Sequence, residues 1–385
     1  MRSYSSGPSS FALRGETIGE CLAGTAGTMP EALALVSCHQ GARLSWAELH
    51  AAVKEAARAF LALGVAKGER IGIWSPSRVE WILTQLAAAE VGAILVNVNP
   101  AYRPSELAYA LRQSAARFLV TAPRFRAAEY LDMLAEVRSE LTDLDKVVVL
   151  DDEATGVPGD MGWSAFLAGA STVSAGALAE RGEALEAEDA INIQYTSGTT
   201  GNPKGATLSH HNILNNGACV ADVLGYSSAD RICVPVPMYH CFGSVGGTMA
   251  SLTSGAAMVL PAEAFEPNAT LDAIATESCT SVYGVPTMFI AMLESPRFSE
   301  FDLSSLRTGI MAGAPCPVEV MKRVVNEMHA KEITIAYGMT ETSPVSTMTR
   351  RSDDLDRRTS TVGTVFPHVE MKVVDPETGS TVPVG

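Results

Sequence analysis

The sequence predicts an α/β fold, in which two doubly wound subdomains pack as a layered αβαβα structure and the start of a small β-barrel-like subdomain follows. Short apolar runs of strand length alternate with helix-length segments along most of the chain. Most of these runs lack the alternation of a half-exposed strand, which is typical of parallel sheets covered on both faces. The 385 residues exceed a typical single domain, so we expect more than one subdomain.

Helix-capping residues mark the first elements. Ser45 and Glu48 form a capping-box pair before a run of apolar residues at helical spacing, which predicts a helix. A strand is predicted at residues 70–74. Ser77 and Glu80 repeat the capping pattern and predict a second helix, which ends near residue 90.

Later elements follow the same exchange of strand and helix. Residues 151–188 are rich in Ala, Gly and acidic residues, so we interpret them as a connector with at most one helix. Residues 369–374 and 380–384 flank a DPETG turn and predict a hairpin. The other predicted strands are residues 93–98, 118–121, 146–150, 191–195, 232–236, 257–260, 281–283 and 333–336.

These elements suggest three consecutive parts. We assign residues 1–205 to the first α/β subdomain, residues 206–344 to the second, and residues 345–385 to an incomplete β-rich subdomain. The chain ends directly after the predicted hairpin, so we expect that a further C-terminal domain is absent.

Composition and charge exclude several classes of protein. The net charge is −15, so the chain lacks the positive field that binds nucleic-acid phosphates. The seven cysteines are scattered without a C-x-x-C pair, which predicts neither a zinc site nor a disulfide framework. No apolar run reaches the roughly 18 residues of a transmembrane helix. We therefore expect a cytoplasmic protein with no nucleic-acid partner.

The loop YTSGTTGNPKG, residues 195–205, carries the strongest functional pattern. Glycines allow close approach of backbone N–H groups, hydroxyls add donors, and Lys204 adds a point charge, so the loop is suited to a polyphosphate. It follows an apolar strand, and open α/β sheets bind ligands at the carboxyl ends of their strands. The spacing differs from that of a Walker A loop. The alternative interpretation is a polar surface turn.

Four ordered motifs together resemble the adenylate-forming, or AMP-binding, superfamily, which includes acyl-CoA and aryl-CoA synthetases, peptide adenylation domains and firefly luciferase. They are the loop above, PMYHCFG at residues 237–243, GAP at residues 313–315, and YGMTET at residues 337–342. MYHCFG and VNVNPAYRPSEL, residues 96–107, are most similar to medium- and long-chain fatty acyl-CoA synthetases. No motif of a serine hydrolase, zinc protease or dinucleotide-binding protein is present.

The resemblance implies a role for each matching residue. Lys204, His240, Thr340 and Glu341 are implied as catalytic, with Thr196 and Glu341 near Mg²⁺, a hard cation that prefers oxygen ligands. The implied substrate residues are His240, Cys241, Phe242, Gly243, Val285 and Gly309. The implied ATP-binding residues are Thr196, Ser197, Gly198, Thr199, Thr200, Gly201, Lys204, Gly313, Ala314, Pro315, Tyr337, Gly338, Met339 and Thr340.

Structural alternatives stand beside these roles. Glu341 also fits a solvated loop carboxylate, and His240 a hydrogen-bonded core histidine. Cys241 has no identifiable partner for a nucleophilic role, so we interpret it as packing. The apolar residues around Val285 and Met288 fit either a core helix or the wall of an acyl tunnel.

The implied reaction is the ATP-dependent activation of a fatty acid to an acyl-adenylate, followed by transfer to CoA. Family members carry a ribose-binding aspartate, a hinge and a catalytic lysine beyond the part of the family that this chain matches, so we expect little full ligase activity from these 385 residues. An aryl-CoA ligase, an acyl-AMP ligase and a non-catalytic nucleotide-binding module remain alternatives. The resemblance allows a monomer or a homodimer.

Overall fold

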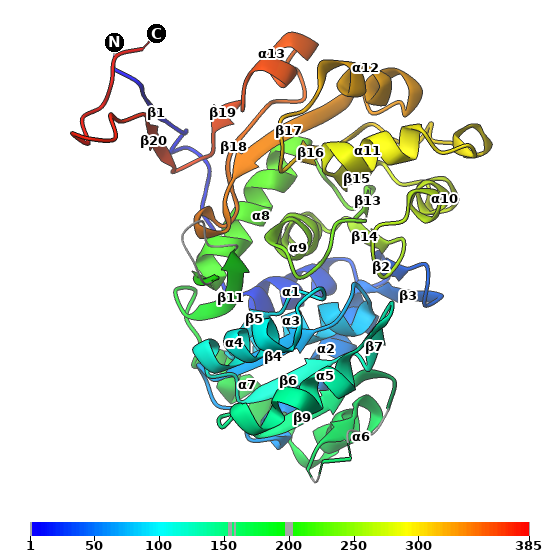
Figure 1. Ribbon diagram of the computed structural model, residues 1–385, viewed down its shortest axis with the longest axis vertical. Coiled ribbons are helices and arrows are strands. Elements are labelled where there is room, and N and C mark those ends of the chain that lie inside the picture. The colour runs from blue at the N-terminus through cyan, green and yellow to red at the C-terminus, as the bar shows by residue number, and fades with distance from the viewer. Residues whose placement is uncertain (1, 153–155, 158, 197–202, 385) are drawn as a thin grey trace.

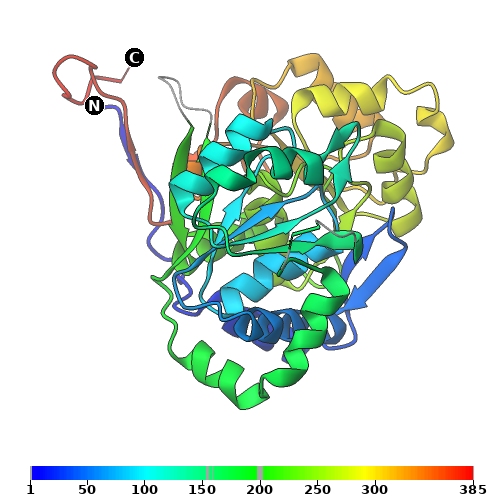
Figure 2. The ribbon, with the colours of Figure 1, turned by 60° about the horizontal axis from the view of Figure 1, so that its bottom comes forward.

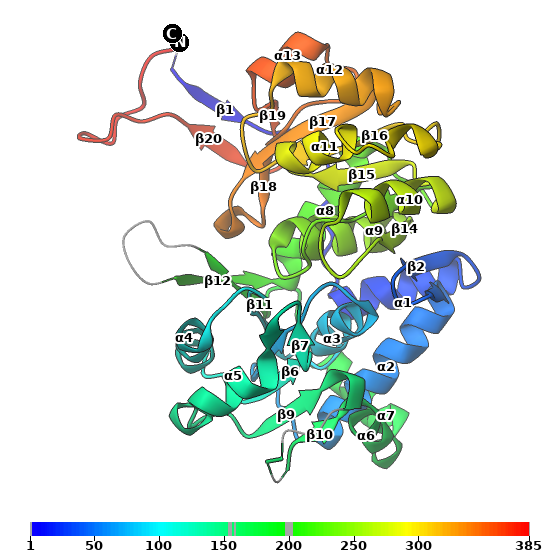
Figure 3. The same cartoon turned by 45° about the vertical axis from the view of Figure 1, so that its right-hand side comes forward.

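The computed structural model describes residues 2–152, 156–157, 159–196 and 203–384. Within these residues, two large mixed sheets and their helices stack as five layers (Figures 1 and 3). The predicted αβαβα fold is thus confirmed. Ser197, Gly198, Thr199, Thr200 and Gly201, which were predicted to bind phosphate, lie outside the described residues.

The first sheet has the order β10-β9-β6-β4-β5-β11-β12 in the described chain. Its strands run parallel except for β12, which pairs antiparallel with β11. Gln194 of β11 pairs with Asn97 of β5 in this register. The strands are β4 (Arg70–Trp74), β5 (Ile94–Asn97), β6 (Phe118–Thr121), β9 (Lys146–Val149), β10 (Met161–Gly162), β11 (Ala190–Thr196) and β12 (Lys204–Ser209).

The second sheet has the order β19-β18-β17-β16-β15-β13-β14-β2-β3 among the described strands. The strands at residues 33–37 and 42–45 belong to this sheet, although we assigned residues 1–205 to the first subdomain. The strand at residues 345–348 also belongs to it, although we assigned residues 345–385 to a third, β-rich subdomain. Its strands are β2 (Leu33–Ser37), β3 (Ala42–Ser45), β13 (Arg231–Cys233), β14 (Ala257–Leu260), β15 (Ser281–Gly284), β16 (Thr308–Ala312), β17 (Glu332–Gly338), β18 (Val345–Met348) and β19 (Thr364–Val365).

Helices cover both faces of both sheets. Buried apolar residues of α4 and α5 pack on the outer face of the first sheet, and those of α10, α11 and α12 on the outer face of the second. Helices α1, α3, α8 and α9 lie between the sheets (Figure 1). The helices are α1 (Ile18–Thr28), α2 (Trp46–Ala62), α3 (Val79–Glu90), α4 (Pro104–Ser114), α5 (Tyr130–Val137), α6 (Trp163–Ala168), α7 (Ala175–Glu183), α8 (His210–Leu224), α9 (Thr248–Ser254), α10 (Pro267–Glu277), α11 (Pro286–Leu293), α12 (Val318–Glu327) and α13 (Leu355–Ser360).

One predicted helix cap is confirmed and one is wrong. Ser45 and Glu48 form the reciprocal capping box of α2. At α3, by contrast, the N-cap residue Arg78 does not cap the helix with its side chain, and Gln40 Oε1 accepts from the first backbone N–H, that of Val79, at 2.8 Å. Ser77 instead accepts a hydrogen bond from the backbone of Met238, so tertiary contacts override the local pattern. The predicted connector at residues 151–188 contains two α-helices, α6 and α7, rather than at most one.

The C-terminal segment forms an arm that projects from the layers (Figures 1 and 2). The strand β20 (Glu370–Lys372) pairs antiparallel with the N-terminal strand β1 (Tyr4–Ser6). The predicted hairpin is reduced to a turn at Asp375 and one antiparallel bridge, Val374 to Thr381. The strand β20 takes β1 as its partner instead, so the two ends of the described chain lie side by side.

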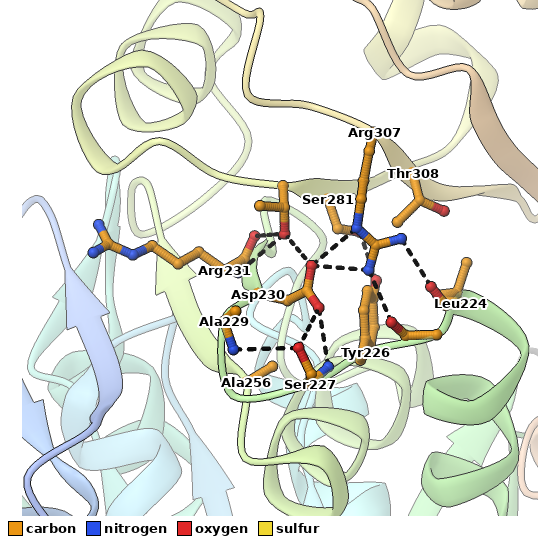
Figure 4. Close-up of polar contacts among 12 residues, drawn as sticks. Leu224, Tyr226, Ser227, Ala229, Asp230, Arg231, Ala256, Ser281, Arg307 and Thr308 are labelled. Carbon is orange, nitrogen blue, oxygen red and sulfur yellow. Dashed lines mark hydrogen bonds and ion pairs between the residues drawn. The ribbon is translucent and has the colours of Figure 1, made fainter.

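A polar cluster joins the amino ends of β13, β15 and β16 (Figure 4). Asp230 is 5% exposed. Its carboxylate accepts from Arg307 Nη2 at 2.8 Å, from Thr280 Oγ1 at 2.7 Å and from the Ser227 backbone at 2.9 Å. Arg307 also donates to the carbonyl oxygens of Leu224, the last residue of α8, and of Gly225, its C-cap. The cluster therefore ties α8 to the second sheet at the edge opposite the carboxyl ends of its strands.

Candidate active site

A cleft of about 610 Å³ lies where the carboxyl ends of strands from both sheets meet. It collects residues from five segments, which are the stretch after β5, the β11–β12 hairpin, residues 239–246 before α9, the end of β16, and the stretch from the end of β17 to the start of β18. Ligands of open α/β sheets bind at such edges. The described residues that line it are Asn99, Gln194, Tyr195, Thr196, Lys204, Tyr239, His240, Cys241, Phe242, Gly246, Ile310, Ala312, Gly313, Ala336, Tyr337, Gly338, Met339, Thr340, Glu341, Pro344 and Val345.

The β11–β12 hairpin presents Thr196 and Lys204 to the cleft as paired residues of two adjacent strands. Two tyrosines fasten the hairpin to α4: Tyr195 donates to the Ala110 carbonyl at 2.9 Å, and Tyr109 donates to the Pro203 carbonyl at 3.1 Å. The base of the phosphate-type loop is thus held against a helix. Among the described residues that line the cleft, Lys204 is the one with a cationic side chain.

The end of β17 supplies the opposite wall. Tyr337 and Met339 are 46% and 49% exposed, and Thr340 is buried. A short 3₁₀ turn, Thr340–Thr342, places Glu341 at the rim. Within the described cleft lining, Glu341 is the one carboxylate. The structure therefore brings Lys204 and Glu341, predicted from distant motifs, to the same cleft.

His240 faces the cleft with a defined tautomer. The backbone N–H of Phe242 donates to His240 Nδ1 at 3.1 Å, so the neutral ring carries its proton on Nε2. The ring is reachable by solvent, but the surrounding cleft walls desolvate it and lower its pKa below the usual value. His240 is thus a neutral N–H donor at neutral pH.

The neighbouring cysteine has no nucleophilic character. Burial raises the pKa of Cys241 to about 11, and its Sγ lies 3.8 Å from Thr340 Oγ1. The thiol stays protonated at neutral pH, in agreement with the packing interpretation.

Several predicted site residues do not line the described cleft. Of the predicted GAP turn, Gly313 lines the cleft, whereas Ala314 and Pro315 are exposed to solvent outside it. Gly243 packs against the Pro237 carbonyl instead of lining the cleft. Val285 precedes α11 and lies behind Gly313. Gly309 is inside β16, where a Cβ would lie 2.1 Å from the Val282 carbonyl oxygen, so close strand packing explains this glycine.

Other lining residues were not predicted. Asn99, Tyr195 and Tyr239 lie within the quoted motifs, and Gln194 directly precedes one, so their place in or beside these motifs at strand ends is the pattern that indicates them. Gly246 belongs to a π-helical segment, Phe242–Gly247, and such segments are frequent at functional sites. Of the apolar members, Ala336 ends a predicted strand, whereas no strand was predicted at Ile310, Ala312 or Val345.

The donor set fits a magnesium ion that a phosphate ligand brings with it. Within the described chain, His, Cys, Asp and Glu side chains nowhere gather in groups of three that could hold a metal alone. Mg²⁺ commonly uses one or two protein oxygens together with water and substrate phosphates. Thr196 and Glu341, both at the cleft, would hold it, and it would neutralise phosphate charge there.

The fold and the cleft define an α/β protein whose lysine-bearing hairpin and facing carboxylate suit a phosphate-bearing ligand. More particularly, the chain belongs to the AMP-binding enzyme family, which it matches over residues 22–385.

Relatives from two organisms resemble all or nearly all of the chain. It is 43% identical to the medium-chain acyl-CoA ligase ACSF2, mitochondrial, of Danio rerio, over 100% of this chain and 65% of that protein. It is 41% identical to the putative acyl-CoA synthetase YngI of Bacillus subtilis, over 94% of this chain and 68% of that protein. The chain therefore spans about two thirds of these relatives.

A solved structure shares the fold and a fainter sequence likeness. The anthranilate CoA ligase AuaEII, determined in complex with anthranoyl-AMP, aligns with a TM-score of 0.86 at 25% identity, over 97% of this chain and 69% of that one.

Each helix in the described ranges is too short or too polar to cross a membrane.

Proposed function

We propose that this chain is the nucleotide- and acyl-binding part of an ATP-dependent acyl-CoA ligase that acts on medium-chain fatty acids. The observation that carries the proposal is the convergence of Lys204, His240, Thr340 and Glu341 on one cleft. A carboxylate oxygen of the acid attacks the α-phosphorus of ATP and pyrophosphate leaves. The thiol of CoA then displaces AMP from the acyl-adenylate.

The cleft residues stabilise this first step with a positive charge and with hydrogen-bond donors aimed at the reacting groups. Lys204 offers a cation to the β- and γ-phosphates, and the buried hydroxyl of Thr340 offers a donor to the α-phosphate. His240 presents Nε2–H to the oxygen shared by acid and phosphate, because Nδ1 is occupied by the Phe242 amide. The Phe242 amide orients the His240 ring before the charge moves, as electrostatic catalysis requires.

The apolar end of the cleft suits an alkyl chain. Ile310, Ala312, Ala336 and Val345 line it together with Phe242, whose ring stacks on Tyr283 at a centroid distance of 5.5 Å. An aryl acid is the second candidate, since the anthranilate ligase shares this fold. Acyl-adenylate formation assayed with octanoate, palmitate and benzoate tests the proposal. Turnover of none of them contradicts it, and preference for benzoate selects the second candidate.

Substituting Gly246 is expected to shorten the acids that the cleft accepts. A Cβ there would meet Phe242 and Tyr283 at 3.5 and 3.8 Å, so Gly246→Ala fits while Gly246→Leu projects into the apolar end. Displacing two methylenes costs about 1.6 kcal/mol. Gly246→Leu should therefore raise KM for octanoate about tenfold and leave KM for butyrate within twofold. Equal effects on both acids would contradict this location of the acyl chain, and Gly246→Ala is the matched control.

Acid pH is expected to switch His240 off. Because desolvation lowers the His240 pKa, the neutral ring persists below the usual histidine pKa of about 6.5. Protonation puts a second N–H against the Phe242 amide and turns the ring away. The rate of acyl-adenylate formation should therefore stay level from pH 8 to about 6.5 and fall only below it. His240→Gln should abolish this acid limb, while His39→Gln, outside the cleft, should keep it.

We further propose that these 385 residues bind ATP and acid but yield little acyl-CoA alone, since they span 65% of the zebrafish relative. Comparison of acyl-CoA production by this chain and by a chain of the relatives' full length tests this, and equal rates contradict it.

The proposed oligomeric states are a monomer and a homodimer, and light scattering distinguishes the two.

For the compartment we propose the cytoplasm, because all seven cysteines are free thiols. A mitochondrial relative makes the equally reducing matrix the alternative, and fractionation of the source cells decides between them.

A further inference from the structure

Polar side chains interrupt one face of β11 where the core would otherwise be apolar. Asn192 and Gln194 are alternate residues of the strand and therefore share a face. Both are buried, as is Asn97, which stands opposite Gln194 on β5. Burying amides is costly unless every group finds a partner, so their presence calls for a role that packing alone does not supply.

The three amides form one connected chain of hydrogen bonds. Gln194 Nε2 donates to Asn192 Oδ1 at 2.6 Å, and Asn192 Nδ2 donates to Asn97 Oδ1 at 3.0 Å. Asn192 Nδ2 also donates to the Leu95 carbonyl at 2.9 Å, which ties the chain to the β5 backbone. The orientation of each amide is thus set by its neighbour.

Both ends of this series of hydrogen-bonded amides bind the segment that carries His240. Asn97 Nδ2 donates to the Tyr239 carbonyl at 3.1 Å, directly before His240. Gln194 Nε2 reaches Ser244 Oγ at 3.3 Å, and Ser244 Oγ donates to the His240 carbonyl at 3.2 Å. From α3, Gln85 adds a bond to the Ser244 carbonyl at 3.0 Å. The segment is therefore hydrogen-bonded to the first sheet on both sides of His240, at Tyr239 and at Ser244.

The same strand continues into the hairpin at the cleft, since Gln194 is followed by Tyr195 and Thr196. We infer that the buried amides Asn97, Asn192 and Gln194, acting through Ser244, are positioning residues that hold His240 in register with the phosphate-binding strand β11. The catalytic part of this inference rests on the proposed ligase function, while its structural part does not. A shift of the segment by a fraction of an ångström would misalign the His240 donor.

The test removes each link separately. Asn97→Leu deletes the donor to Tyr239, and the milder Ser244→Ala deletes the donor to His240 and the acceptor for Gln194. Thr121→Val is the matched control, because Thr121 is equally buried in the same sheet but its hydroxyl bonds, among the described residues, to the carbonyls of Trp74 and Ala122 rather than to the His240 segment. The rate of acyl-adenylate formation should fall about tenfold in both link variants, with KM for ATP within twofold.

A double-mutant cycle separates positioning from general damage. In a His240→Ala background, Asn97→Leu and Ser244→Ala should cost almost nothing further, because the group they position is gone. Equal costs in the two backgrounds would overturn the inference, as would an equal cost of Thr121→Val.

A spectroscopic readout keeps this test independent of the ligase proposal. In ¹⁵N-histidine spectra, His240 should show one tautomer in the unsubstituted chain and in Thr121→Val, and a mixture in both link variants. Unchanged His240 signals in the link variants would overturn the inference whatever the enzymology shows. Absence of adenylate formation from any acid, with altered signals in the link variants, would contradict the proposed function alone and leave the positioning role supported.

Discussion

Glu341→Gln is expected to reduce the rate of acyl-adenylate formation about 100-fold. The substitution keeps the shape of the side chain and removes one negative charge from the rim of the cleft. That carboxylate and Lys204 line the same cleft, which is proposed to hold a triphosphate, and a carboxylate beside phosphates is unfavourable unless a cation lies between them. Losing it should therefore weaken binding of the magnesium complex of ATP at least tenfold, while metal-free AMP binds within twofold of the original affinity.

Two measurements check this result. Calorimetric titration gives the affinities for ATP with Mg²⁺ and for AMP without it, and pyrophosphate release gives the rate. Glu300→Gln removes the same charge from an exposed ion pair with Arg297, away from the cleft lining, and should change neither. An equal loss of AMP and Mg-ATP binding would show that Glu341 supports the fold of the turn rather than the metal.

Local patterns were sufficient for most strands of the first sheet and, in the second, for the central strands β13, β14, β15 and β17. The predicted residues 118–121 and 257–260 coincide with β6 and β14, because each is a short, fully buried apolar run between turn residues. The strand β16 was missed, since Gly309 interrupts it. The reason for that glycine is the close Val282 carbonyl of the adjacent strand, which only the assembled sheet reveals.

Long-range pairing was beyond prediction. The β2–β3 hairpin precedes every described strand of the first sheet along the chain, yet it completes the second sheet beside β14. No local property of residues 33–45 indicates which sheet they join. The same holds for β20, which pairs with β1 across more than 360 residues, while only the residues that follow it close the short hairpin.

For the cleft, the sequence alone indicates the residues proposed to contact substrates, whereas the residues that position them are recognised only in the folded structure. Lys204, His240, Thr340 and Glu341 lie in motifs with unusual composition, so the sequence alone indicates them. It does not indicate the amides that hold His240, because Asn97 and Gln194 stand in different strands and look like ordinary polar interruptions. Their function appears only once the register pairs them.

Asp230→Ala is expected to lower the free energy of unfolding by about 3 kcal/mol, the largest stability effect we expect from one substitution outside the cleft. Asp230 accepts hydrogen bonds from Arg307, Thr280 and Ser227 and is almost fully buried. Removing it deprives the Thr280 hydroxyl of its 2.7 Å acceptor and leaves Arg307 with Glu332 as its remaining carboxylate partner, so much of the desolvation cost of these groups is no longer offset.

Urea denaturation followed by circular dichroism measures this effect, and a graded series identifies its cause. Asp230→Asn keeps one acceptor oxygen but not the charge, so its loss of stability should lie between that of Ala and the unsubstituted chain. Glu327→Ala breaks an exposed ion pair with Arg323 and should cost less than about 1 kcal/mol. If Asp230→Ala cost no more than Glu327→Ala, the bonds at the amino ends of β13, β15 and β16 would not hold α8 to the sheet. Substrate affinity should remain unchanged in every folded variant, because the cluster lies at the edge of the sheet opposite the cleft.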